Sequence, residues 1–305
     1  MNLSLLSFLP AVDRGWKSMK AECDLPTCHN TQLLRSIPGA RQGIRVGQQW
    51  YCCVDCFALG ARGPLGALSR RRAVEMRRNP RLSLSLALHT KGFLTAEQLR
   101  LANSMSGRNE DELAANLMRL GLVTEKQVAA ARAAQWGCAA LGQDYVGMTG
   151  MMVQSDLPHA ILHACSAAPM HYSATGRRIL LGFVSRIEYS VIESIETMTG
   201  CRVEPCFITQ TELDEQMERT VRMSDSKETV VDDPGTPDKM ARTLGRAAVE
   251  IGAREAEFTH YKNLVWARLR GKRGKMDVIF RMSHVAETIE PMEFEMLDQK
   301  VATLK

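Results

Sequence analysis

Five of the nine cysteines of this sequence fall within one short stretch, and thiolates are well suited to hold a soft or borderline metal ion. Cys23 and Cys28 are separated by four residues, and the others follow in the run Cys52-Cys53-x2-Cys56. Two short-spaced cysteine pairs joined by a loop can place four thiolates at the corners of a tetrahedron, which is the geometry of structural Zn²⁺ sites. The sequence therefore predicts a structural zinc site with the ligands Cys23, Cys28, Cys52 and Cys56.

One of the four ligands is ambiguous in the sequence. Cys53-x2-Cys56 has the commoner spacing, whereas Cys52-x3-Cys56 matches several small zinc modules, and we favour Cys52. His29 is a reserve ligand. A hairpin over residues 43–51 would deliver the second pair, and because so short a segment has little core, the metal would supply its folding energy. The alternatives are free buried thiols whose spacing is a coincidence, and a redox role.

The remaining cysteines are scattered through apolar stretches, so we expect small buried hydrophobic side chains at Cys138, Cys165, Cys201 and Cys206. The sequence has no run of about 18 apolar residues, so we expect no membrane-spanning helix. Its apolar first ten residues lack the basic region and the cleavage site of a signal peptide. We therefore expect a cytoplasmic protein, in a reducing compartment where clustered cysteines indicate metal rather than disulfides.

A basic tract, RRRAVEMRRNPR at residues 70–81, follows the cysteine-rich stretch. We interpret it as a solvated helix face or linker, with contact to nucleic acid, acidic lipid or an acidic protein as the alternative. The tract contains no aromatic residue to stack on bases, and the net charge of the chain is only +5. The sequence therefore does not favour nucleic acid as a partner.

An internal repeat follows the basic tract. Each copy has two leucines four positions apart, then a glycine, then a threonine: Leu84, Leu88, Gly92 and Thr95, and again Leu113, Leu117, Gly121 and Thr124. Leucines with this spacing lie on one face of a helix, a glycine commonly ends a helix, and a threonine caps the next one. The sequence predicts two helical hairpins that bury their apolar faces against each other.

This repeat resembles the N-terminal, MshEN-type domain of type II secretion and type IV pilus assembly ATPases. In sensing members of that family, the domain binds cyclic di-GMP through two motif copies that begin Arg-Leu-Gly and end in Gln. This sequence has Ser83-Leu84-Ser85 and Glu112-Leu113-Ala114 at the two starts, and Ser106 and Gln135 at the two ends. The substitutions remove a guanidinium group and the close approach of glycine backbone. We therefore expect cyclic di-GMP to bind weakly or not at all, unless Arg81 or Arg119 substitutes.

The resemblance continues into a small α/β sandwich. Apolar runs predict strands over 178–184 and 202–208, and helices over 187–199 and 211–222. Three histidines in this part share no metal-binding spacing and are interpreted as surface or packing residues: His159, His163 and His171.

Residues 224–238 are polar, contain two prolines and a glycine, and are typical of a linker. A helix over 240–253, strands over 255–259, 264–269 and 277–280, and a helix over 292–302 are expected next. This order resembles the start of the PAS-like domain that precedes the motor in the same ATPases. The phosphate-binding motif G-x-x-x-x-G-K-[ST] is not found in the sequence, so we expect no ATPase motor.

These patterns predict an α+β protein with five segments: a zinc-ribbon-like module (1–68), a basic linker (69–81), an MshEN-like domain (82–223), a second linker (224–238) and a truncated α/β domain (239–305). No pairing of a nucleophile with a base stands out, so we expect no enzyme. The favoured function is a scaffold or adaptor that docks on a protein partner, which the resemblance places in the secretion or pilus machinery. The alternatives are a cyclic-dinucleotide sensor and a nucleic-acid binder that uses the zinc module.

Overall fold

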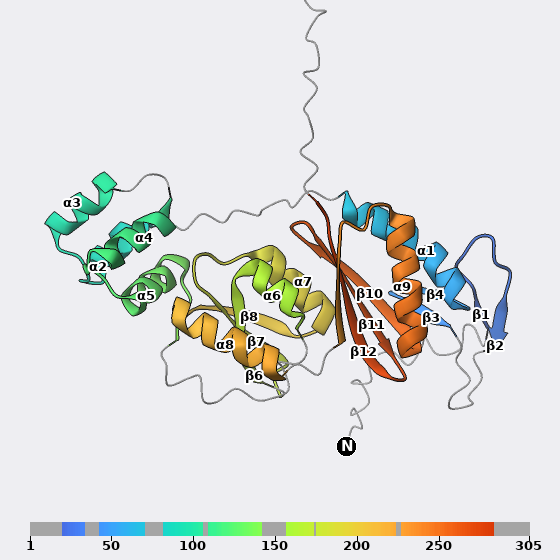
Figure 1. Ribbon diagram of the computed structural model, residues 1–305. Coiled ribbons are helices and arrows are strands. Elements are labelled where there is room, and N and C mark those ends of the chain that lie inside the picture. Colours follow the sequence, from blue (N-terminus) through green and yellow to red (C-terminus); the bar gives the residue numbers. More distant parts are fainter. Residues whose placement is uncertain are drawn as a thin grey trace, which may run out of the picture.

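The computed structural model of this protein describes residues 20–33, 43–70, 82–105, 109–141, 157–173, 175–223 and 227–283. Figure 1 shows three parts in a row: a helical module, a four-stranded sheet with its helices, and a six-stranded sheet. The described residues thus form a mixed α/β structure, as the sequence predicts. Most of the basic tract, Ser106 and the helix expected over 292–302 lie outside the described residues.

The predicted helical hairpins are present. The module contains the helices α2 (Leu84–Thr90), α3 (Ala96–Met105), α4 (Glu110–Arg119) and α5 (Glu125–Trp136). Gly92 and Gly121 adopt φ values of 74° and 68° at the turns, a conformation that costs little only without a Cβ. Thr124 caps α5 in a capping box with Gln127. The leucines of both copies meet in one core, as the repeat predicts.

The middle part is a four-stranded sheet in the order β5-β8-β7-β6. Its elements are β5 (Ala139–Ala140), α6 (His159–Cys165), β6 (Ala167–Ser173), β7 (Arg178–Phe183), α7 (Tyr189–Thr199), β8 (Arg202–Phe207) and α8 (Gln210–Met223). Strand β7 is antiparallel to β6 and parallel to β8. The apolar runs that predict β7, α7, β8 and α8 correspond to elements of the structure, with ends that differ by at most two residues.

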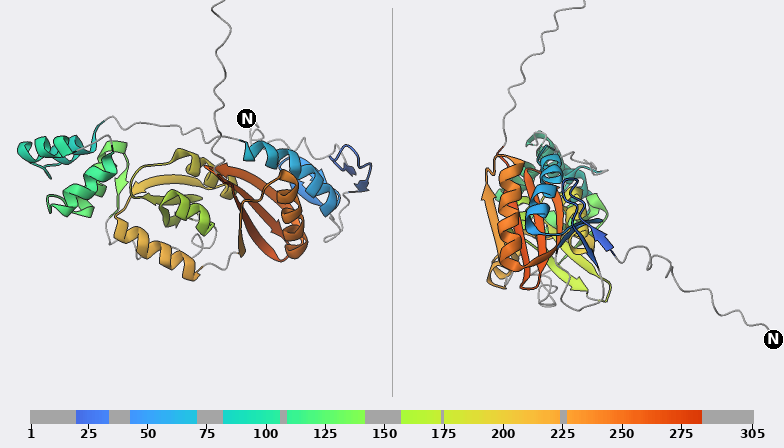
Figure 2. Two further views of the ribbon diagram at one scale, coloured as in Figure 1. Left: turned by 45° about the horizontal axis from the view of Figure 1, so that its top comes forward. Right: turned by 90° about the vertical axis from the view of Figure 1, so that its right-hand side faces the viewer.

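The third part is a six-stranded sheet in the order β4-β3-β10-β11-β12-β9. Its strands are β3 (Ile44–Val46), β4 (Gln49–Tyr51), β9 (Lys227–Asp232), β10 (Ala253–Tyr261), β11 (Leu264–Gly271) and β12 (Gly274–Arg281). Helices α1 (Val54–Ser69) and α9 (Pro237–Ile251) lie side by side on one face of this sheet (Figure 2). The opposite face packs on the middle part, since Trp266 shares a core with Val191 and Ile195 of α7.

This sheet differs from the sequence-based division in two ways. First, residues 227–232 form strand β9 inside the segment expected to be a linker. Five of its six side chains are polar or exposed, because β9 is an edge strand, and an edge strand has the composition of a linker. Second, strands β3 and β4 of the segment 1–68 belong to the same sheet as strands of the segment 239–305. Pairing between such distant segments leaves no local pattern in the sequence.

No helix in the described part of the chain combines the length and the apolar character that a membrane crossing requires.

Candidate metal centre

Two loops and a helix start bring four cysteines together. Cys23 and Cys28 lie in the loop between β1 (Lys20–Glu22) and β2 (Thr31–Leu33), which pair as an antiparallel hairpin. Cys52 directly follows β4, and Cys56 lies in the first turn of α1. The two halves of the site are joined by backbone, because Asp24 N–H donates to the carbonyl of Trp50 over 2.9 Å.

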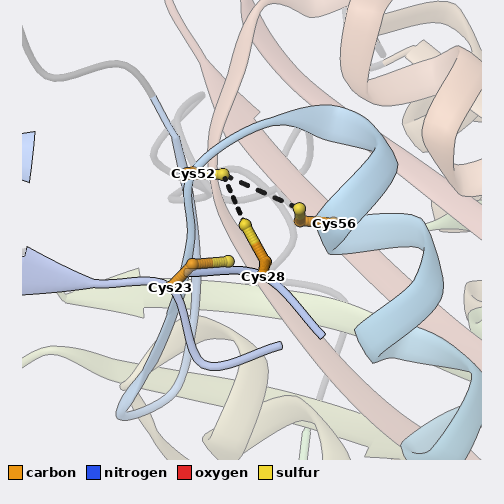
Figure 3. A group of neighbouring side chains, drawn as sticks. All are labelled: Cys23, Cys28, Cys52 and Cys56. Carbon is orange, nitrogen blue, oxygen red and sulfur yellow. Dashed lines mark hydrogen bonds between the residues drawn. The ribbon is translucent and has the colours of Figure 1, made fainter. Parts of the chain in front are cut away.

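The four sulfur atoms have the separations that a tetrahedral metal site requires. All four Sγ atoms lie within 4.8 Å of one another, and Cys52 Sγ is 3.7 Å from that of Cys28 and 3.6 Å from that of Cys56 (Figure 3). A tetrahedron with Zn–S bonds of about 2.3 Å has sulfur atoms roughly 3.8 Å apart. The thiols therefore fit a first-row metal ion such as Zn²⁺ with only small adjustments.

The site is largely closed to solvent. Cys23, Cys52 and Cys56 are 7–8% exposed, and Cys28 is half-buried. Burial raises the pKa of Cys52 to about 11 and raises that of Cys56 further. The backbone N–H of Asn30 lowers the pKa of the less buried Cys28. Metal binding needs thiolates, so an incoming ion must displace protons from the buried pair.

Cys53 and His29 lie outside this group. The side chain of Cys53 is exposed and caps α1, with its Sγ accepting from the N–H of Cys56 over 3.5 Å. That backbone hydrogen bond lowers the pKa of Cys53. His29 is exposed and is not among the clustered ligand atoms. The structure thus gathers the predicted set with Cys52, because α1 begins at Val54 and directs Cys53 away from the other thiols.

The other predicted residues lie apart from this centre. All nine cysteines are free thiols, and three of the four scattered ones are buried, with Cys138 half-buried. The rings of His159 and His163 are 6.0 Å apart on α6, and His171 lies in β6.

Both altered and retained positions of the cyclic di-GMP motif make intramolecular contacts. Ser83 caps α2, and the N–H of Leu84 donates to Glu110 over 2.8 Å. The buried amide of Gln135 donates to the carbonyl of Leu82 over 2.7 Å. Weak or absent binding of cyclic di-GMP remains a prediction.

A buried charge network was not foreseen from the sequence. Arg268 on β11 and Asp277 on β12 are 2% and 0% exposed and form an ion pair of 2.8 Å. Trp266 Nε1 donates to the same carboxylate over 2.8 Å. The signal in the sequence is the alternation Trp266-x-Arg268-x-Arg270 in an apolar strand, which puts charged residues on one face of the sheet.

No family model matches the sequence, and no curated protein matches it either. Among solved structures, the chain is similar to the N-terminal domain of XpsE, with 24% identity, a TM-score of 0.35, and coverage of 47% of this chain and 96% of that one. A second crystal form of the XpsE domain gives 23% identity and a TM-score of 0.29. A structure of MshE with cdg gives 17% identity and a TM-score of 0.37, over 46% of this chain and 99% of that one. The likeness concerns the fold alone, over about half of this chain.

Proposed function

We propose that this protein is a non-catalytic adaptor whose helical module binds a protein partner and whose metal centre is structural. The observation that carries the proposal is a difference between the two repeat copies. The first copy exposes Leu86 and Leu101, at 40% and 47%, and the second copy has Ala115 and Ala130 at the equivalent positions and exposes one leucine, Leu120, at 48%. The buried centre of a protein–protein interface is more apolar than the rest of the surface, so Leu86 and Leu101 are candidate contact residues.

The thiolate cluster supports a structural role for the metal. Four cysteine ligands fill a tetrahedral shell, so no position is left for a substrate or an activated water. We infer that the ion is Zn²⁺, since four thiolates at these separations are its preferred structural environment. Nine free thiols are consistent with a cytoplasmic protein, where thiols stay reduced.

The metal assignment is tested by elemental analysis of the purified protein. About one zinc per chain is expected, since one four-ligand site is present in the described residues. A Cys23→Ser, Cys28→Ser double variant should lose the zinc, and a Cys138→Ser variant should keep it. Protein that is free of metal while residues 20–57 remain folded would contradict the assignment.

The adaptor function is tested on the exposed leucines. A Leu86→Ala, Leu101→Ala double variant gives the first copy the alanines that the second copy has at these two positions. Its control is Val249→Ala, which removes an apolar side chain from α9 that is still more exposed, at 63%. Components of a secretion or pilus machinery, the partner class that the sequence resemblance implies, are the binding candidates. We expect the leucine variant to bind the partner at least about tenfold more weakly, a loss of roughly 1.4 kcal/mol.

Equal binding by the wild type, the leucine variant and the control would show that this surface is not the docking site. Neither variant changes a residue in the core of the module, so the helices should remain folded. Circular dichroism of the two variants checks this expectation.

A further inference from the structure

The β3–β4 hairpin adds two strands to the edge of the sheet that β9 to β12 form. Strand β3 lies parallel to β10, with Arg45 opposite Glu255 and Val46 opposite Ala256, and β4 pairs with β3 on its outer side. Each of the two added strands has three residues. A contact with so few hydrogen bonds is marginal by itself, since even an isolated two-stranded hairpin is barely stable in water.

Helix α1 packs on α9 along both of its halves, with Val54 and Ala58 beside Gly245, and only its first half is also joined to the metal centre. Its second half packs on α9, with Leu65 fully buried and Gly66 close to Pro237 at the start of α9. Arg62 adds an exposed ion pair with Asp238 over 2.7 Å. This half has its own apolar contact with the C-terminal part and does not include a metal ligand.

The first half of α1 is tied to the metal centre. Cys52 directly follows Tyr51, and Cys56 directly precedes Phe57, so each ligand of the second pair adjoins a buried aromatic residue. The rings of Tyr51 and Phe57 meet edge to face at 6.4 Å, and Phe57 stacks on Phe258 of β10 at 6.4 Å. Gly60 makes room for this arrangement, because a Cβ there would lie 2.2 Å from the Tyr51 ring.

A continuous path of contacts thus runs from the thiolate cluster to strand β10. We propose that the bound metal controls whether the β3–β4 hairpin is added to the edge of strand β10. With the ion in place, the segment 43–57 is held on β10. Without the ion, this segment leaves β10, while the second half of α1 stays on α9. This inference rests on the proposed metal centre. The docking surface in this proposal is the edge of strand β10, and the β3–β4 hairpin of the same chain occupies it.

Residue-resolved hydrogen exchange on the full chain tests the proposal. Alternate amides of β10 point to opposite edges of the strand, and those that can face β3 lie beside Glu255 and Ala256, the two residues in register with it. On removal of the metal by a chelator, we expect the amides that face β3 to lose protection by about tenfold or more, because their partner strand is released. Amides that face β11, and those of α9, should keep their protection. Addition of Zn²⁺ should restore the exchange pattern, and Mg²⁺, which prefers oxygen ligands, should not.

Two cysteine variants complete the test. Cys28→Ser removes one metal ligand and should show the exchange pattern of the metal-free protein. Cys53→Ser is the matched control, since serine also caps helices and this side chain lies outside the cluster. The inference is wrong if the β3-facing amides stay protected in the metal-free protein, or if protection is lost equally along β10 and α9. Failure of the metal centre itself would be distinguished by elemental analysis of the same sample, which would then show no bound metal.

Discussion

In the α2–α5 module all four helices come from one short stretch of the chain, whereas the strands of the six-stranded sheet come from three separate parts of the chain. The module is held by leucines at regular spacing around small turns. The sheet is held by long-range strand pairs, by a buried ion pair and, as we propose, by a metal ion at its N-terminal end. The arrangement of helices that contact each other locally can be predicted from a sequence repeat. The contacts between distant parts of the chain depend on a few residues, and substitution of these residues should lower the stability strongly.

The largest effect is expected at the buried ion pair of the sheet. Asp277→Ala leaves the guanidinium of Arg268 buried without its carboxylate, and this should lower the free energy of unfolding by about 3–5 kcal/mol. The matched control is Asp232→Ala, which breaks the exposed pair with Arg281 at the edge of the same sheet. That control should cost at most about 1 kcal/mol. Urea denaturation, followed separately in the sheet and in the module, measures both values.

Similar losses for the two aspartate variants would contradict a special role for burial. A large loss confined to the α2–α5 module would contradict the assignment of the ion pair to the stability of the sheet.

The contrast between the two regions also explains what could be predicted from the sequence. The module was predicted from Leu84 and Leu113 onward, because helix periodicity, glycine turns and threonine caps are all local features. The cluster of four cysteines was predicted in the same way, because each cysteine pair is short-spaced. The exclusion of Cys53 from the cluster could not be established from the sequence. It depends on the exact residue at which helix α1 begins, and the cysteine spacing does not determine that residue.

Long-range features were missed for physical reasons. Strand β9 has a polar, exposed pattern because only one of its edges is paired, so its composition resembles a linker. Strand β3 is too short for its alternation to be recognised, and its partner β10 lies in a distant part of the chain. Arg268 and Asp277 each lie between apolar residues of their own strand, and only the pairing of β11 with β12 makes them partners.

A second prediction concerns the pH dependence of the metal centre. The pKa of Cys52 is raised to about 11, so at neutral pH its thiol is protonated in the metal-free protein. Each proton that the metal displaces makes binding about tenfold weaker, or roughly 1.4 kcal/mol, for every pH unit of acidification. Zinc affinity should therefore fall steadily from pH 8 to pH 6. Competition with a chromophoric chelator of known pH dependence measures it.

A zinc affinity that does not change with pH would show that the bound ligands are already thiolates before the metal arrives.

The smallest effect is expected in the locally ordered region. Thr124→Ala removes the side chain that accepts from the N–H of Gln127 over 3.3 Å and opens the capping box of α5. The loss should be about 1 kcal/mol, the usual cost of an N-cap. Thr95 makes the corresponding bond with Gln98 over 3.2 Å in the first copy, so Thr95→Ala is the matched variant and should lose a similar amount of stability.

The two capped helices, α3 and α5, contact the rest of the protein differently. Helix α5 carries Arg132, which is buried and donates to the carbonyl of Val184 beside the middle sheet, so its opening should also loosen that contact. Native-state hydrogen exchange should therefore show loss of protection spreading from α5 to the end of β7 in Thr124→Ala, and confined to α3 in Thr95→Ala. Identical, strictly local changes in both variants would show that the module is coupled to the sheet less tightly than Arg132 indicates.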